Sequence, residues 1–520
     1  MTVSTVCILI VIILYMAIIV GVGITFAKKN KNTDDFYLGG RQLGPIVTAM
    51  SAEASDMSSW LLMGLPGVAY ISGLADAGWT AIGLAIGTYV NWLIVAKRLR
   101  RYSQKAGNAI TIPVFFKNRF NDNGNAIIGI AALAIFIFFV PYTGSGFAAC
   151  GKLFSTLFGV DYLPAMIISA VVIVLYTMLG GFLAASFTDL IQSIIMTIAL
   201  VVVVIFGISI AGGIDNVINN AEAIPGYLSM VQSGDVVTKE ASPYGILTII
   251  STAAWGLGYF GMPHILLRFM AIKDENKIKL SRRIASIWVV ISMAVAIIIG
   301  IIGYSMSLEG AIPSFTTTSE AETTIINIAT LLSQKGVLLA LLAGLILAGI
   351  LACTMSTSDS QLLAASSSVS QNIFVDVFHV KLNEKQKLGV ARITVVVIAI
   401  IGVIIAWNPE NSVFKIVSFA WAGFGATFGP AMLFSLFWRR TNKWGVLAGM
   451  LSGIISIFLW KFLVRPIGGV FDIYELLPAF IISSLFILVI SLVTAPPSKE
   501  VTDVFDEVAG KKVEEAKGVQ

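Results

Sequence analysis

The feature that most constrains this chain is a series of apolar runs, each long enough to cross a lipid bilayer. A helix needs about 20 mainly apolar residues to span the hydrocarbon core, where it satisfies its own backbone hydrogen bonds. Such runs recur along nearly the whole sequence, and hydrophobic residues make up 57% of the 520 positions while charged residues make up 12%. A transmembrane β-barrel would instead show segments of about ten residues with alternating hydrophobicity. The sequence therefore predicts an all-α polytopic membrane protein.

We expect about thirteen membrane-spanning helices. The first run has no basic segment before it and three lysines soon after it, which predicts a retained span with its N-terminus outside rather than a cleaved signal. The predicted spans lie near residues 5–26, 44–70, 79–96, 126–158, 163–179, 190–211, 244–270, 284–306, 336–370, 390–407, 413–438, 444–462 and 476–493. They form a single transmembrane domain over residues 1–495, and residues 496–520 form a short polar tail.

The distribution of basic residues supports this orientation. With the N-terminus outside, about 28 of the 34 Lys and Arg residues fall in the loops and tail on the cytoplasmic side. The C-terminus is therefore predicted to be cytoplasmic. The net charge of +5 does not indicate nucleic-acid binding, because the cations lie in short loops between spans.

The second apolar run, Gly44 to Tyr70, is interrupted by polar residues, namely Ser51, Glu53, Ser55, Asp56, Ser58 and Ser59. An aspartate in a lipid-facing helix costs about 2.5 to 3.5 kcal/mol on insertion scales, so Asp56 is expected to contact protein, water or an ion. Glu53 could bind a cation, stay protonated or pair with a basic side chain. This interruption is our first candidate binding site.

A second interruption lies within residues 244–270, where Gly256, Gly258, Gly261 and Pro263 fall close together. Proline removes a backbone donor and glycine removes side-chain bulk, so this helix is expected to bend or open and to free carbonyl groups. Two interrupted helices five spans apart predict inverted repeats, near residues 44–211 and 244–438, with a binding site between them. The alternative is that glycine and proline are simply frequent in membrane helices.

A third polar cluster, CTMSTSDSQ, lies in the ninth predicted span. Sodium prefers oxygen ligands, and the hydroxyls of Ser356 and Thr357 could replace its water shell together with carbonyls near Ala54 and Met57. The alternative is that these hydroxyls bond to their own helix or join neighbouring helices. Asp359 could help to bind a second cation, but polar packing is the preferred interpretation.

Five segments of the chain carry a resemblance to a known family. They are SAEASDMSSWLLMGLPG, GGFLAASFTD, AAWGLGYFGMPHILLRFM, MSTSDSQLL and SFAWAGFGATFGPAMLFSLFWRR. These segments resemble the solute:sodium symporter family from about residue 35 to residue 453, and the segment around Trp255 resembles its proline-transporting branch. The resemblance implies a LeuT-like core of two inverted five-helix repeats, with flanking helices that bring the total to thirteen.

The same resemblance implies a function. It implies sodium-coupled uptake of L-proline by alternating access across a plasma membrane of the bacterial type, with Na+ as the co-transported ion and no enzymatic activity. The alternative within transporters is a sodium symporter for another small amino acid or carboxylate, such as pantothenate. An intramembrane aspartyl protease would need paired aspartates, such as Asp56 and Asp359, but the sequence contexts of such proteases are missing. A channel is a further alternative, and its flux would not saturate as the solute concentration rises.

The resemblance also implies roles for individual positions. Sodium would be held by the carbonyls of Ala54, Met57 and Cys353 and by the hydroxyls of Ser356 and Thr357. Substrate contacts would fall on Ser58, Trp60, Tyr142, Trp255, Tyr259 and Pro263. Coupling or the ion path would involve Arg41, Asp56 and Asp189. Cys353 stands where an alanine is expected, which a carbonyl ligand tolerates.

The spacing of two of these residues agrees with a substrate role. Trp255 and Tyr259 are four residues apart, so on a helix they share one face. They would offer aromatic walls to a pyrrolidine ring and a hydroxyl to its polar groups. The alternative is that both rings serve as interfacial anchors or as ordinary helix packing.

Overall fold

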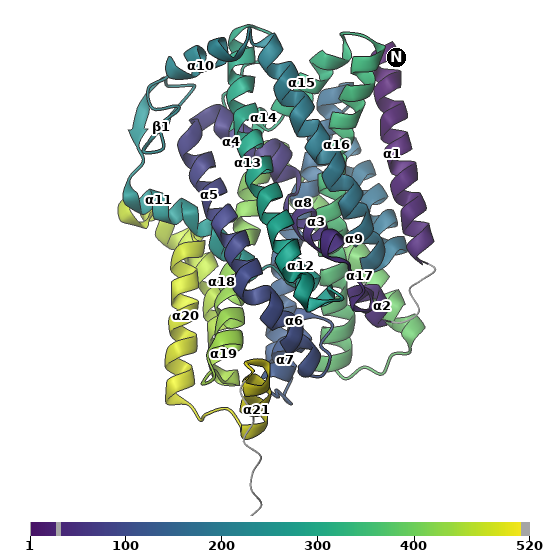
Figure 1. Ribbon diagram of the computed structural model, residues 1–520, viewed down its shortest axis with the longest axis vertical. Helices are drawn as coiled ribbons and strands as arrows, with labels where there is room; N and C mark the ends of the chain where they lie inside the picture. The colour runs from purple at the N-terminus through teal and green to yellow at the C-terminus, as the bar shows by residue number, and fades with distance from the viewer. Residues whose placement is uncertain (1, 28–32, 511–520) are drawn as a thin grey trace, which may run out of the picture.

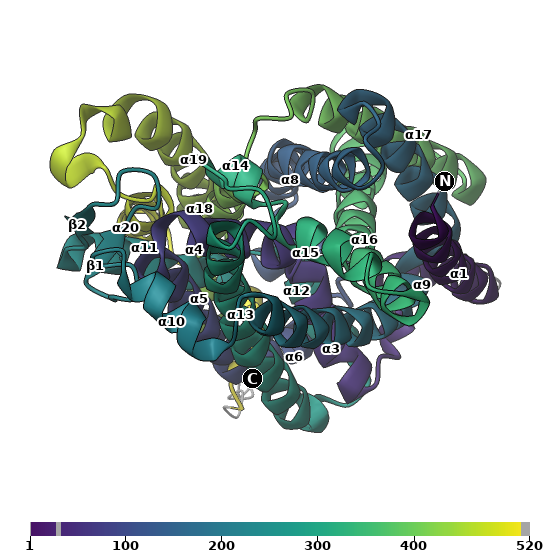
Figure 2. The ribbon, with the colours of Figure 1, turned by 90° about the horizontal axis from the view of Figure 1, so that it is seen from above.

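The computed structural model describes residues 2–27 and 33–510. Most of the chain forms long helices that run roughly side by side along the vertical direction of Figure 1. Seen from above, α12 lies near the middle of the bundle with other helices on all sides (Figure 2). This arrangement confirms the prediction of an all-α polytopic protein.

The helices are α1 (Val3–Ala27), α2 (Thr33–Leu38), α3 (Pro45–Asp56), α4 (Leu65–Ser72), α5 (Leu74–Val90), α6 (Ala96–Lys105), α7 (Ile112–Arg119), α8 (Ala126–Phe158), α9 (Tyr162–Ile210), α10 (Ile214–Glu222), α11 (Ile246–Ala253), α12 (Pro263–Ala271), α13 (Ile278–Leu308), α14 (Thr318–Ala321), α15 (Thr324–Ser333), α16 (Val337–Ser367), α17 (Glu384–Ile405), α18 (Val413–Phe437), α19 (Lys443–Leu459), α20 (Leu476–Val493) and α21 (Lys499–Val508). Strands β1 (Gln232–Gly234) and β2 (Ala241–Pro243) pair antiparallel, with Gln232 opposite Pro243.

Several helix starts follow from local sequence. Asn383 and Gln386 form a reciprocal capping box at the start of α17. The side chains of Ser412 and Asn442 accept backbone N–H groups at the starts of α18 and α19. Pro45 opens α3, where its missing N–H leaves no helical bond unmade.

The number of spans is smaller than expected when length and apolar character are the criteria. Ten helices in the described ranges are long and apolar enough to cross a membrane, or eleven if the bent pair Ile246–Phe260 and Pro263–Ala271 counts as one span. The predicted count of thirteen is therefore not confirmed. The other two predicted spans, residues 44–70 and 163–179, correspond to a broken helix and to the short apolar helix Tyr162–Met178. Gly181, with a φ of 69°, interrupts α9 after this short helix.

Both predicted interruptions are confirmed. α3 ends at Asp56, Met57 leaves the helical conformation with a ψ of 69°, and a π-helical turn, Trp60–Gly64, leads into α4. The other broken helix consists of α11, a 3-10 segment (Ala254–Phe260) and α12, with a bend of 45°.

Pro263 gives a physical reason for the second break. It is the first residue of α12. Because proline has no N–H and its ring clashes with the carbonyl four residues earlier, the carbonyl of Tyr259 cannot take part in a regular α-helical bond.

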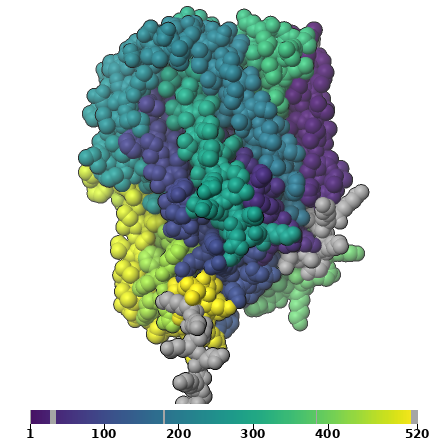
Figure 3. All heavy atoms as spheres, viewed as in Figure 1, coloured from purple at the N-terminus to yellow at the C-terminus, as the bar shows by residue number. Residues whose placement is uncertain are grey.

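The tail contains a helix that the sequence analysis does not predict. α21 lies against the lower end of the molecule in Figure 3, and Val501, Phe505 and Val508 are buried. Lys105 pairs with Glu507 at this end. The tail is polar on average, but its apolar residues recur at helical spacing, which gives α21 one face that can pack.

Candidate functional site

Three of the five predicted sodium ligands meet at the break after α3. The hydroxyl of Ser356, in α16, donates a hydrogen bond to the carbonyl oxygen of Ala54 at 2.7 Å. The same hydroxyl lies 3.1 Å from the carbonyl oxygen of Cys353. All three residues are fully buried. Two carbonyls and one hydroxyl therefore offer a hard monovalent cation three oxygen ligands in one place.

The other two predicted ligands are buried near this break but are not hydrogen-bonded to the cluster. Met57 follows the last residue of α3, where the backbone leaves the helix. The hydroxyl of Thr357 has no hydrogen-bond partner among the described residues. A buried hydroxyl without a partner costs about 1 to 3 kcal/mol, so a cation that takes its oxygen as a ligand would compensate for this cost. The five-ligand set stays a prediction.

Asp56 connects the two broken helices. Its Oδ2 accepts a hydrogen bond from the phenol of Tyr259 at 2.5 Å. Its backbone carbonyl accepts the indole N–H of Trp60 at 3.1 Å and the phenol of Tyr142 at 3.3 Å. Three of the predicted substrate contacts thus converge on one residue at the end of α3. The other carboxylate oxygen of Asp56, Oδ1, is buried and has no partner in the described part of the chain.

Trp255 lies within a group of aromatic rings. Its ring centroid is 6.3 Å from that of Trp60, 6.2 Å from Trp421, 5.2 Å from Phe414 and 5.2 Å from Tyr474. Only Trp60 and Trp255 belong to the set that the sequence predicts. The other three rings come from α18 and from the segment before α20, and no local pattern in the sequence shows that they face Trp255.

The two remaining predicted substrate positions lie at the ends of the helix breaks. The hydroxyl of Ser58 accepts the backbone N–H of Trp60 at 3.4 Å. Pro263 is buried at the start of α12. Both residues are therefore placed where the backbone departs from regular helix.

A cavity of about 710 Å³ reaches Trp255 from the end of the molecule that carries β1 and β2. Its lining includes Ser233 in β1, Tyr244, Phe414 and Tyr474. Toward the opposite end, a cavity of only about 10 Å³ lies beside Arg268 and Tyr37. The aromatic group thus borders a large cavity on the β1–β2 side.

Asp189, predicted to lie on the ion path, forms part of a buried network around Arg268. Arg268 Nη2 is 3.2 Å from Asp189 Oδ2 and 2.6 Å from the hydroxyl of Ser360. Its Nε donates to the hydroxyl of Ser51, which donates to Asp189 Oδ2 at 2.6 Å. Its Nη1 donates to the carbonyl of His264. One guanidinium therefore joins α3, α9, α12 and α16.

Arg268 was not singled out from the sequence, although a signal was available. An arginine inside an apolar span is costly unless it is paired, which marks it as a functional candidate. The network also reaches the oxygen cluster of Ala54, Cys353 and Ser356, because the hydroxyl of Ser360 donates to the backbone carbonyl of Ser356 at 2.9 Å.

Arg41 lies at the end of the molecule opposite β1 and β2. Its guanidinium donates to the carbonyl of Met270 at 2.7 Å, to that of Ala109 at 2.8 Å and to the side chains of Ser103 and Asn108. It thereby connects the short helix Gly39–Arg41 to the end of α12. It is not part of the cluster around Ser356.

Glu53 is bound to an indole rather than to a basic side chain. Its Oε1 accepts the N–H of Trp92 at 2.9 Å, and its Oε2 has no partner in the ranges that the structure describes. Of the three alternatives for Glu53, pairing with a basic side chain is not the arrangement found in the described residues.

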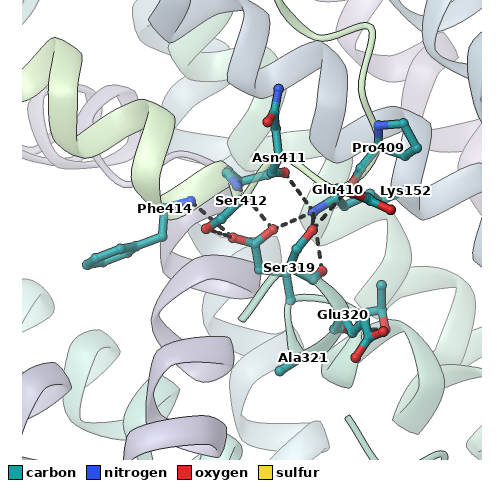
Figure 4. A network of polar contacts seen from close by, with 12 residues as sticks. Lys152, Ser319, Glu320, Ala321, Pro409, Glu410, Asn411, Ser412 and Phe414 are labelled. Carbon is teal, nitrogen blue, oxygen red and sulfur yellow. Dashed lines mark hydrogen bonds and ion pairs between the residues drawn. The ribbon is translucent and has the colours of Figure 1, made fainter. Parts of the chain in front are cut away.

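A further buried ion pair lies at the β1–β2 end (Figure 4). Lys152, in α8, is 2.6 Å from Glu322 Oε2, which follows α14. The ammonium also donates to the carbonyl and hydroxyl of Ser319 and to the carbonyl of Asn411. Figure 4 shows these groups gathered between α8 and the start of α18.

Glu322 also binds the N-terminus of α18. Its carboxylate accepts the hydroxyl of Ser412 at 2.7 Å and the backbone N–H groups of Val413 and Phe414, each at 3.1 Å. A carboxylate is favourable there because the first N–H groups of a helix lack partners and carry partial positive charge. Since Phe414 packs against Trp255, this network fixes one wall of the aromatic group.

Residues 36–453 match the model of the sodium:solute symporter family. The chain belongs to the sodium:solute symporter family. This is a family of transporters coupled to sodium, not of enzymes, and the expected Na+ dependence and membrane location agree with it.

Two bacterial relatives are similar over almost their whole length. The high-affinity proline transporter PutP of Bacillus subtilis is 40% identical over 92% of this chain and 97% of its own. The sodium/proline symporter of Haemophilus influenzae is 41% identical over 95% of this chain and 96% of its own. This family member is therefore a multi-pass protein of the bacterial plasma membrane.

A solved structure shares the fold. A Na+-coupled sialic acid symporter in a substrate-bound, outward-open state is 18% identical, with a TM-score of 0.75 over 95% of this chain and 99% of that chain. This similarity confirms the LeuT-like fold. The repeat boundaries near residues 44–211 and 244–438 stay a prediction.

Proposed function

We propose that this sodium symporter takes up L-proline by alternating access. The observation that carries the proposal is the hydrogen bond from Tyr259 to Asp56, because it joins a predicted substrate wall to the helix that supplies two predicted sodium ligands, Ala54 and Met57. The names of the relatives, which are proline transporters, support proline as the substrate.

The aromatic group suits the ring of proline. Trp60, Trp255 and Tyr259 offer flat apolar surfaces close to the polar end of α3. A zwitterion that enters a site of low dielectric needs partners for both of its charges. The positive end of a half-helix, such as the start of α12, can meet a carboxylate there.

Sodium supplies the driving force in this proposal. One sodium ion that moves inward through a membrane potential of 100 mV releases about 2.3 kcal/mol, to which its concentration gradient adds. Sodium binds from outside at Ala54, Met57, Cys353, Ser356 and Thr357 and orders α3 and α16. This ordering raises the affinity for proline, and both solutes leave inside after the bundle rearranges.

The topology is part of the proposal. The N-terminus and the β1–β2 side face outward, and α21 faces the cytoplasm. The excess of Lys and Arg in the loops assigned to the cytoplasmic side supports this orientation. The large cavity that reaches Trp255 then opens to the outside, where proline enters.

The experiment is uptake of labelled proline by purified protein in liposomes. An inward sodium gradient should drive saturable uptake, a potassium gradient should not, and unlabelled proline should compete better than pantothenate or other amino acids. Stronger competition by another carboxylate would indicate that this solute, rather than proline, is the substrate. Flux that does not saturate would indicate a channel and contradict symport.

A further inference from the structure

Two side chains from different helices bind backbone carbonyls of the 3-10 segment between α11 and α12. The amide of Asn91, which follows α5, donates to the carbonyl of Tyr259 at 3.0 Å. The indole N–H of Trp421, in α18, donates to the carbonyl of Trp255 at 2.8 Å. Both acceptors belong to residues of the proposed substrate site. By binding these buried carbonyls, the two donors stabilise the open form of the helix.

Trp421 contacts the second substrate residue as well. Its ring lies 5.1 Å from the ring of Tyr259, at an interplanar angle of 88°, which is the favourable edge-to-face geometry. The side chain is 1% exposed. One residue of α18 therefore fixes the backbone at Trp255 and the ring at Tyr259 together.

The approach of the indole depends on Gly258. A Cβ atom added at Gly258 would lie 1.9 Å from Nε1 of Trp421, which is far inside van der Waals contact. Any larger residue at this position would displace the indole from the Trp255 carbonyl. In the sequence WGLGY, the second glycine, Gly258, leaves room for the indole N–H of Trp421 to reach the carbonyl of Trp255.

We propose that Trp421 is a positioning residue for the substrate. It acts on the substrate only through Trp255 and Tyr259, which it contacts directly. By holding both residues in place before the substrate binds, it lowers the conformational cost of binding. Within the described residues its indole makes no hydrogen bond to Ala54, Cys353 or Ser356, so its direct effect is on the substrate rather than on sodium. This inference rests on the proposed function, because proline is the substrate that the site is taken to bind.

The test is the variant Trp421→Phe, which removes the N–H donor and keeps an aromatic ring. The half-saturation concentration for proline should rise about tenfold, as expected for loss of a buried hydrogen bond. The half-saturation concentration for sodium, measured at saturating proline, should stay within about twofold, and the maximal rate should be largely kept. Gly258→Ala should reproduce this pattern, since it displaces the same indole.

The chain offers matched controls for both variants. Trp79 also donates its indole N–H to a backbone carbonyl, that of Met230, at 2.7 Å, but in the β1–β2 region. Gly245 precedes α11 and has no atom within 4 Å of an added Cβ. Trp79→Phe and Gly245→Ala should keep the proline half-saturation concentration of the original protein. The amount of folded protein after purification is measured for every variant.

Three outcomes would overturn the inference. The first is an unchanged proline half-saturation concentration in Trp421→Phe, while Trp255→Ala raises it. The second is an equal rise for proline and sodium, or loss of folded protein in both Trp421→Phe and Gly258→Ala, which indicates a structural role. The third is absence of sodium-driven proline uptake in the unaltered protein, which rejects the proposed function and, with it, the role of Trp421 toward proline.

Discussion

The phenol of Tyr259 donates a hydrogen bond to Oδ2 of Asp56 at 2.5 Å, across 203 positions of the sequence. Both groups are buried, and each stands beside a break in its helix. A conformational change at the end of α3 therefore acts directly on the ring of Tyr259.

The first prediction concerns this bond. Tyr259→Phe and Asp56→Asn should each weaken proline binding, and the double variant should be little worse than either one. The coupling energy in the double-mutant cycle should be about 1 to 3 kcal/mol, since the two groups are direct partners. Equilibrium binding of labelled proline measures it, with Tyr162→Phe as the control because that phenol binds the carbonyl of Ala406 in another region. Additive effects of the two changes would contradict the coupling.

The second prediction concerns the proposed sodium site at Ala54, Cys353 and Ser356. Ser356→Ala removes the hydroxyl that touches the carbonyls of Ala54 and Cys353, so the sodium half-saturation concentration for uptake should rise about tenfold. At saturating sodium, the affinity for proline should recover. Ser169→Ala is the control, because that hydroxyl donates within α9, to the carbonyl of Ala165. A sodium dependence like that of the original protein would place the ion elsewhere.

The third prediction concerns Arg268. Arg268→Lys keeps the positive charge but loses the planar fork that reaches Asp189, Ser51 and Ser360. Uptake should fall at least about tenfold, and adding Asp189→Asn should not lower it much further, because the two residues act as one unit. Initial rates in proteoliposomes give the comparison. Full activity of Arg268→Lys would show that only the charge matters.

The fourth prediction compares a buried ion pair with an exposed one. Glu322→Gln leaves the buried ammonium of Lys152 without its counter-ion, which should lower the free energy of unfolding by about 3 to 5 kcal/mol. Asp472→Asn breaks the pair between Asp472 and Arg465, in which the two side chains are 61% and 41% exposed. This change should lower the free energy of unfolding by about 1 kcal/mol or less. Thermal unfolding in detergent ranks the two variants. Equal losses of about 1 kcal/mol or less would mean that the Lys152 network does not stabilise the β1–β2 end.

The sequence predicts the two broken helices correctly because their signals are local. Pro263 cannot continue a helix, and Asp56 is too costly for a lipid-facing position, so each segment shows its own break. The convergence of Asp56, Tyr142 and Tyr259 was reached through the resemblance to a family. Spacing within one helix places Trp255 and Tyr259 on one face but does not show what that face meets.

The partners of the site could not be predicted for the same reason. Trp421 and Trp255 are 166 residues apart, and Lys152 and Glu322 are 170 residues apart. Helical periodicity says which residues share a face, and only the packing of the bundle decides which faces meet. The predicted count of thirteen spans stays unconfirmed for a related reason, since the broken helix at residues 44–70 and the short helix Tyr162–Met178 do not reach the length and apolar character of a full span in the described residues.

The most direct test of the account is the binding of labelled proline to the purified protein as the sodium concentration is varied in place of potassium. The account predicts that the affinity for proline rises with sodium and that Ser356→Ala shifts this dependence to higher sodium, with the same affinity at saturation. Proline binding that is equally tight in potassium alone would contradict the coupling of the two sites.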